Sequence, residues 1–207
     1  MEVIFMVIKK EIENIMKKNI GKIYSINDFY NYDLGSQNTI KCSLYKLAQE
    51  NKIIRVFDGL YMKPRFSKIF QENVIPSTKE IIDKIAKKFG WEIIPTSEWA
   101  LNYTGLSTQV PNVYIFASTG PNRIYYYGNN KIIFKHVANY KIYPFSKKMA
   151  LVIQALIVLE KNNVTKSHLK KLANFTKDIK NELTKNINLL PVWIQENLKK
   201  IKDYQYA

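Results

Sequence analysis

The polar side chains between residues 37 and 49 are of the types that read base edges in DNA. Asn and Gln pair with adenine through two hydrogen bonds, Lys donates to guanine, and a small side chain can contact a thymine methyl group. The helical spacing of Ile40, Leu44 and Leu47 predicts that these three face a core. A rotation of about 100° per residue then turns the polar side chains outward. The residues expected to reach bases are Gln37, Asn38, Thr39, Lys41, Cys42 and Tyr45.

A second set of residues is expected to contact backbone phosphates. Hydroxyls at helix N-termini lie beside N–H groups that attract phosphate, and Lys and Arg neutralise it. Such contacts position a protein on DNA without specifying sequence. The alternative is capping alone for the serines and a solvated side chain for each cation. The set is Ser25, Ser36, Lys46, Arg55, Lys63, Arg65 and Lys68.

The elements that must position these side chains follow in a recognisable order. Gly21 ends a first helix, Ser25 caps a short second one, and Gly35-Ser36 forms the turn and cap that open a third. Asp58-Gly59 between two β-prone runs predicts a hairpin. Three helices and a hairpin are typical of a winged helix-turn-helix, although a generic small α+β subdomain is the alternative. The expected helices are 3–18, 26–32 and 37–50, and the strands are 53–57 and 60–63, within a domain of residues 1–66.

A linker over residues 67–76 is expected to lead into a larger domain of residues 77–207. Ser77 and Glu80 form a capping box that opens a helix ending at Gly90. The following pattern alternates short strands, a hairpin and apolar helices, so the expected fold class is α+β throughout. The predicted elements are a strand at 91–95, a helix at 97–104, strands at 113–118, 123–127 and 131–137, a helix at 149–159, and helices opened by Thr165, Thr176 and Pro191.

Composition favours a polyanionic partner. The formal charge is +15, which favours nucleic acid first and an anionic membrane second. Heavy use of Lys, Asn and Ile also follows from A+T-rich codons, which is the alternative. Cys42 is the only cysteine and suits a reducing cytosol. No run approaches the roughly 18 apolar residues of a membrane span, so we expect a cytoplasmic protein without a membrane partner.

No constellation of catalytic residues emerges, and we expect neither an enzyme nor a cofactor or metal. His136 and His168 have no second ligand at metal spacing, and Cys42 lies on the polar face described above. Phosphate-binding and dinucleotide-binding motifs are absent. The competing interpretation is a divalent-metal nuclease that uses Glu50, Lys52 or Glu98.

Several segments resemble the AbiEi-type antitoxin family over residues 8–202. They are Gly59 to Ser67, Tyr103 to Pro111, Thr119 to Arg123, Val152 to Leu156 and Pro191 to Ile194. The resemblance implies a winged-helix regulator with a larger C-terminal domain. It further implies a repressor that binds inverted repeats in the double-stranded DNA of its own promoter. A dimer of the protein on this DNA is compatible with such repeats. Such a protein is also the antitoxin of an abortive-infection operon and antagonises a nucleotidyltransferase-like toxin without requiring a stable complex.

The resemblance leaves two interpretations of the second domain open. Glycines and prolines in its loop 105–111 and hairpin 119–135 can simply maintain the fold. Polar loops also concentrate binding residues, so the same segments can form the surface that antagonises the toxin. That surface would include Ser107, Thr108, Gln109, Asn122 and Arg123. Because Gln37 and Asn38 stand where related chains tend to have Arg, the operator sequence cannot be carried over.

The leading hypothesis is therefore a sequence-specific DNA-binding repressor and antitoxin. The main alternative keeps the winged helix but uses it to bind RNA or a protein partner. A random-library selection without a DNA consensus would favour that alternative.

Overall fold

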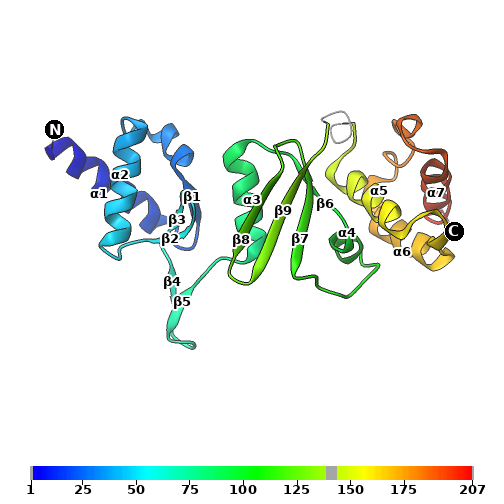
Figure 1. Ribbon diagram of the computed structural model, residues 1–207, viewed down its shortest axis with the longest axis horizontal. Coiled ribbons are helices and arrows are strands. Elements are labelled where there is room, and N and C mark those ends of the chain that lie inside the picture. The colour runs from blue at the N-terminus through cyan, green and yellow to red at the C-terminus, as the bar shows by residue number, and fades with distance from the viewer. Residues whose placement is uncertain (1, 139–143, 207) are drawn as a thin grey trace. The chain divides into compact units, whose positions relative to one another are not determined.

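The computed structural model describes residues 2–138 and 144–206 (Figure 1). These residues form an α+β protein, as the sequence predicts. The chain folds into two compact units, the first over residues 1–89 and the second over residues 90–207.

The first unit opens with three helices and three strands. Its sheet has the order β1-β3-β2, and both pairings are antiparallel. The strand between the first two helices, β1, did not emerge from the sequence, because three residues are too few to show a period-2 pattern. The elements are α1 (Glu2–Lys18), β1 (Ile23–Ser25), the 3-10 helix η1 (Ile26–Tyr32), α2 (Gln37–Gln49), β2 (Ile54–Phe57) and β3 (Leu60–Met62).

One apolar core joins α1, β1, η1, α2 and β3. Ile12 and Met16 of α1 meet Phe29 of η1 and the inner side of α2, and all three are fully buried. Tyr24 of β1 stacks on Phe29 with ring centroids 5.2 Å apart. Burying a large aliphatic or aromatic side chain contributes about 1.5–3 kcal/mol, so this cluster is a major source of stability for the first unit.

A short hairpin and a helix complete the first unit. The hairpin pairs β4 (Arg65–Ser67) with β5 (Glu72–Val74), so part of the segment predicted as a linker is strand. The helix α3 (Thr78–Phe89) begins where the Ser77–Glu80 capping box predicts it. It belongs to the first unit, whereas the sequence pattern placed it in the second domain.

The second unit contains a four-stranded sheet of order β6-β7-β9-β8. Strands β7 and β9 pair in parallel, and the other two pairings are antiparallel. Phe116 and Phe134 are buried on this sheet, and Trp91 meets Phe134 edge-on at 5.5 Å. The strands are β6 (Ile93–Pro95), β7 (Val113–Ser118), β8 (Arg123–Tyr127) and β9 (Asn130–His136), with α4 (Glu98–Tyr103) between β6 and β7.

Three helices of the second unit enclose another apolar core. Val152, Leu172 and Leu198, one from each helix, are fully buried there. The helix predicted to start at Thr176 is a single 3-10 turn. The Thr176 hydroxyl does not cap it and donates instead to the Leu172 carbonyl, 2.7 Å away, at the end of the preceding helix. The elements are α5 (Lys147–Leu159), η3 (Lys161–Asn163), α6 (Lys166–Phe175), η4 (Lys177–Ile179), η5 (Ile187–Leu189) and α7 (Val192–Asp203).

Candidate nucleic-acid interface

Helix α2 begins at a tight turn that fixes its direction. Gly35 has φ +97°, and a Cβ there would lie 3.3 Å from Cδ1 of Ile8 on α1, so both its backbone and its packing favour glycine. Ser36 is the N-cap, and its Oγ accepts a hydrogen bond from the Thr39 backbone N–H at 3.2 Å. The cap satisfies one of the otherwise unpaired N–H groups of the first turn.

The two sides of α2 are divided as the spacing predicts. Ile40, Leu44 and Leu47 are fully buried, and Ser43 is buried beside them. On the other side Tyr45 is 56% exposed, and its hydroxyl accepts a hydrogen bond from Gln49 Nε2 at 2.9 Å. Of the residues predicted to reach bases, Thr39 is half-buried and the others are exposed: Gln37, Asn38, Lys41, Cys42 and Tyr45.

A surface hollow of about 470 Å³ joins the exposed side of α2 to the β2–β3 hairpin. We call it the α2 hollow. It has a mixed lining, with amide, ammonium, guanidinium and phenol groups around an apolar floor. Such a lining suits a partner that offers both hydrogen-bonding edges and flat apolar surface. The lining residues are Ile26, Asn38, Lys41, Cys42, Tyr45, Lys46, Arg55, Gly59 and Tyr61.

The β2–β3 hairpin closes this hollow with an Asp58-Gly59 turn, as predicted. Gly59 has φ +65°, which explains the glycine, and the pairing register shifts between Arg55 and Phe57. The Arg55 guanidinium forms an ion pair with the Asp58 carboxylate. The same turn is held from α3, because Lys88 Nζ donates to the Asp58 carbonyl at 3.1 Å.

The structure does not gather all of the predicted phosphate contacts at the hollow. Lys46 and Arg55 line it, whereas Lys63, Arg65 and Lys68 do not. Lys63 Nζ donates to the Lys52 carbonyl at 2.6 Å and is half-buried. Arg65 and Lys68 are exposed on the β4–β5 hairpin. Their contact with phosphate stays a prediction, as does any contact of Ser36 beyond its capping role.

Ser25 is placed differently from the expectation. It is only 2% exposed, and its Oγ and backbone N–H donate to Asp28 Oδ2 at 2.6 and 2.5 Å. The Asp28 carboxylate already accepts both donors of Ser25, so neither donor is free for a phosphate. Ser25 is therefore a structural residue, and we leave it out of the candidate interface.

Two of the three residues proposed for a nuclease, Glu50 and Lys52, tie α1 to the segment at the end of α2. Lys52 Nζ lies 3.0 Å from Glu50 Oε2 and 3.6 Å from Glu13 Oε2, and Glu50 also pairs with Lys9. Hydrogen bonds from Lys9 and then Lys52 hold the pKa of Glu50 below its ordinary value. This arrangement gives both residues a structural role. Glu98 is exposed in the first turn of α4.

In the second unit, side chains in and beside the loop 105–111 and the hairpin 119–135 form hydrogen bonds with backbone groups of the same segments. His136 Nδ1 lies 2.9 Å from the Gly120 carbonyl, and the Asn122 side-chain oxygen accepts from the His136 backbone N–H at 2.7 Å. The Ser107 hydroxyl accepts from the Gln109 N–H at 3.1 Å. These bonds favour fold maintenance for Ser107 and Asn122.

Three other members of the predicted toxin-antagonism surface remain open to a partner. The side chains of Thr108, Gln109 and Arg123 are exposed. A toxin-antagonism role for them stays a prediction.

Sequence reasoning missed a cluster of lysines around η1. Lys84, Lys87 and Lys88 of α3 line a hollow together with Lys22 and Asp28, far from them in sequence. The i, i+4 spacing of Lys84 and Lys88 was a local signal, but nothing local indicated that α3 lies against η1.

Within residues 2–138 and 144–206, no group of three or more His, Cys, Asp or Glu side chains could hold a metal ion. Over the same ranges no helix has both the length and the apolar character that a bilayer span requires.

The described residues thus define an α+β protein whose first unit presents a polar helix face beside a β-hairpin. A family model matches residues 10–184, and its description is DUF6088, a family of unknown function. Because the match covers most of the chain, the protein belongs to the DUF6088 family. Comparisons with curated proteins and with solved structures gave no match.

Proposed function

We propose that the protein is a sequence-specific DNA-binding regulator whose first unit acts as a winged helix-turn-helix. In this arrangement η1 and α2 form the helix-turn-helix, and the β2–β3 hairpin is the wing. The element order helix–strand–helix–helix–strand–strand and the sheet order β1-β3-β2 support the proposal.

The observation that carries the proposal is the α2 hollow. Asn38 and Lys41 on α2 line one surface with Arg55 at the base of the hairpin. An amide that can pair with adenine and an ammonium that can donate to guanine would then face the major groove, while the guanidinium contacts the backbone. The formal charge of +15 supplies the attraction to a polyanion.

The resemblance to the AbiEi-type antitoxin family extends this proposal. A repressor in the cytoplasm that binds inverted repeats in its own promoter would use α2 on each half-site of a dimer. The second unit would then antagonise a nucleotidyltransferase-like toxin, with Thr108, Gln109 and Arg123 as candidates for that surface. Co-expression with the neighbouring reading frame tests the antitoxin role: loss of protection in the Arg123→Ala variant with unchanged DNA binding would support it.

A selection of duplexes from a random library, followed by gel shifts, tests the DNA-binding proposal. We expect a consensus that wild type binds tightly. Asn38→Ala and Lys41→Ala should each weaken binding by about 1–3 kcal/mol and relax the preference at one base position. Asn174→Ala and Lys171→Ala, at exposed sites on α6, are the matched controls.

The outcomes separate the alternatives. If the selected duplexes share no consensus and the protein binds RNA or another protein tightly, the binding-module alternative would replace the DNA proposal. Unchanged affinity in both α2 variants would show that another surface meets DNA. Nicking of DNA with Mg²⁺ or Mn²⁺ that disappears in Glu50→Gln would favour the nuclease.

A further inference from the structure

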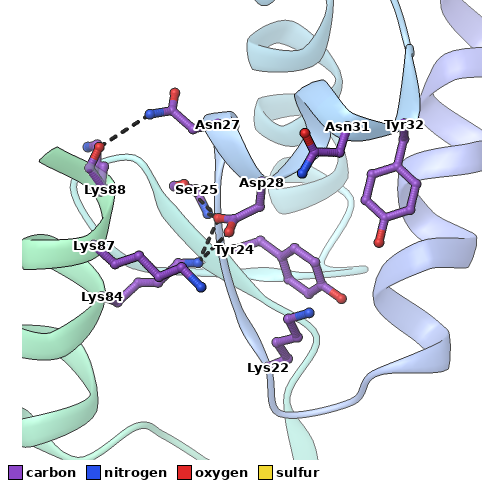
Figure 2. Close-up of a pocket in the computed structure, with 10 residues that line it drawn as sticks. All are labelled: Lys22, Tyr24, Ser25, Asn27, Asp28, Asn31, Tyr32, Lys84, Lys87 and Lys88. Atoms are coloured by element: carbon purple, nitrogen blue, oxygen red, sulfur yellow. Dashed lines mark hydrogen bonds and ion pairs between the residues drawn. The ribbon is translucent and has the colours of Figure 1, made fainter. Parts of the chain in front are cut away.

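A second hollow, of about 370 Å³, opens within the first unit among β1, η1 and α3 (Figure 2). We call it the α3 hollow. Its lining is rich in hydrogen-bond donors and contains a single acidic residue. The lining residues are Lys22, Tyr24, Ser25, Asn27, Asp28, Asn31, Tyr32, Lys84, Lys87 and Lys88.

Three of its four lysines carry charge that no acidic residue in the lining offsets. Lys84 is paired with Asp28, with Nζ 2.6 and 2.8 Å from the two carboxylate oxygens. Lys22 Nζ lies over the Tyr24 ring at 5.0 Å, and Lys88 Nζ donates to a backbone carbonyl. Like charges that converge on one hollow repel each other, and a multivalent anion would relieve that repulsion.

Tyr24 offers a buried hydroxyl that the protein itself does not fully satisfy. Tyr24 is 1% exposed, and its hydroxyl makes no well-formed hydrogen bond within the described part of the chain, although the Asn19 side chain lies near enough to lower its pKa. In Figure 2 the hydroxyl points toward the part of the hollow where Lys22 and Tyr32 lie. Burial raises the pKa of this phenol, so it keeps its proton and can donate. A buried polar group without a partner costs about 1–3 kcal/mol, which an anionic acceptor would offset.

We propose that the α3 hollow binds a small ligand with two or more linked phosphates, such as the phosphate chain of a nucleoside diphosphate or triphosphate. Lys22 and Lys87 have no acidic partner in the lining, and Lys88 adds a third ammonium group once it leaves the Asp58 carbonyl, so together they exceed the charge of a single phosphate, which is about −2 near neutral pH. Lysine binds phosphate as a point charge, and the Tyr24 O–H would add a directional bond. The volume lies within the range of small-molecule sites, about 300–1,000 Å³.

The site also reaches the hairpin turn, so its ligand has a route to regulation. Lys88 lines the hollow and donates to the Asp58 carbonyl, and a Cβ built on Gly59 would lie 2.8 Å from its Nζ. A phosphate that engages Lys88 would compete with that carbonyl and release the turn. This consequence rests on the proposed DNA-binding function, in which the turn is the wing, whereas ligand binding itself does not.

Calorimetric titration of the full-length protein with inorganic pyrophosphate tests the site without DNA. We expect saturable 1:1 binding that is tighter than binding of inorganic phosphate. Lys87→Ala and Lys22→Ala should each weaken it roughly tenfold, the effect of about 1.4 kcal/mol. Tyr24→Phe, which removes only the hydroxyl, should weaken it by a similar factor. Lys10→Ala, an exposed lysine of α1, is the charge-matched control, and circular dichroism checks that every variant is folded.

Titration with ATP in a second series measures whether a base and ribose add affinity. Absence of saturable pyrophosphate and ATP binding to folded wild type would overturn the proposal. An equal loss in Lys10→Ala would do the same, because diffuse charge would then explain the binding. A third contrary outcome is that a random-sequence duplex displaces pyrophosphate and that Lys87→Ala weakens binding of this duplex as much as Lys41→Ala does. The α3 hollow would then contact the DNA backbone. Asn38 and Lys41 line the other hollow, so failure of the DNA-binding proposal would leave the pyrophosphate result intact.

Discussion

The Lys84 ammonium spans both carboxylate oxygens of Asp28, at 2.8 and 2.6 Å, and thereby fastens α3 to η1. Ser25 adds two donors to the same carboxylate. Burial alone would raise the pKa of Asp28, but the hydrogen bonds from Lys84 and Ser25 outweigh it and lower that pKa. This one carboxylate therefore links the start of η1 to a helix that the sequence pattern placed in the other domain.

Asp28→Asn should lower the free energy of unfolding of the first unit by about 1–3 kcal/mol at pH 7, because it leaves the half-buried Lys84 without its counter-charge. A carboxylate whose folded pKa is depressed stabilises the fold above its unfolded pKa and loses that contribution as the pH falls through the folded pKa. The difference between wild type and variant should thus shrink from pH 6 to pH 3. Urea unfolding followed by circular dichroism measures it. A difference independent of pH would argue against the ion pair.

Leu44 and Tyr45 are neighbours on α2 with opposite expected roles. Leu44→Ala removes a fully buried side chain and should cost about 2–5 kcal/mol of stability. Tyr45→Ala should change stability by less than about 1 kcal/mol and instead weaken binding to the selected duplex. The three tryptophans lie in the second unit, so their fluorescence should not respond to either change directly. A large stability loss in Tyr45→Ala would contradict the assigned orientation.

Substitutions of the N-cap residue Ser36 test the start of α2 separately from its buried face. Ser36→Ala removes the acceptor for the Thr39 N–H and should cost about 0.5–2 kcal/mol, whereas Ser36→Asp, also a good cap, should retain most of the stability. Thermal unfolding followed at the helical signal compares the two variants. If Ser36→Asp folds as well as wild type but loses duplex affinity, a phosphate lies near this helix start, because the new charge repels it.

Most of the local order of the first unit could be predicted from its sequence, because every helix and the β2–β3 hairpin carry a local signal. Ile40, Leu44 and Leu47 repeat at helical spacing, Ser36 and Gly35 mark the start of α2, and Asp58-Gly59 marks the turn. Each of these signals lies within a few residues of the element that it specifies. Strand β1 has three residues, and its place beside β3 comes from a pairing between Ile23 and Met62 that no local pattern encodes.

The two candidate sites also differ in how much of each a local sequence pattern could predict. The α2 hollow was half predictable, because its helix side follows from periodicity while Arg55 and Tyr61 join it only through the fold. Ser25 looked like a phosphate ligand because capping and phosphate binding use the same residue type, and only the Asp28 contact tells them apart. The α3 hollow depends on Lys84 meeting a carboxylate 56 positions away, which spacing could not reveal.

Gly120 should be intolerant of any side chain. A Cβ there would overlap ring atoms of Trp91, which is held against Phe134 on the sheet. Gly120→Ala should therefore destabilise the second unit by about 1–3 kcal/mol, the usual cost of overpacking. Tryptophan fluorescence during urea unfolding measures the effect, with Gly128→Ala as a comparison because nothing lies near its Cβ. Gly128 has φ +55°, so that variant reports backbone strain alone. A smaller loss at Gly120 than at Gly128 would contradict the packing argument.

Asp58→Asn should strengthen DNA binding. Asp58 is paired with Arg55 at the edge of the α2 hollow, so it withholds one cation from the backbone and places one anion near it. Asn-Gly also suits this hairpin turn, so the fold should be retained. We expect roughly threefold to tenfold tighter binding near 0.1 M salt and a slope of log affinity against log salt that is steeper by about 0.9 for each added phosphate contact. Asp203→Asn, at the end of α7, makes the same charge change elsewhere and should have a much smaller effect. Equal gains in both variants would assign the effect to net charge and remove the hairpin from the interface.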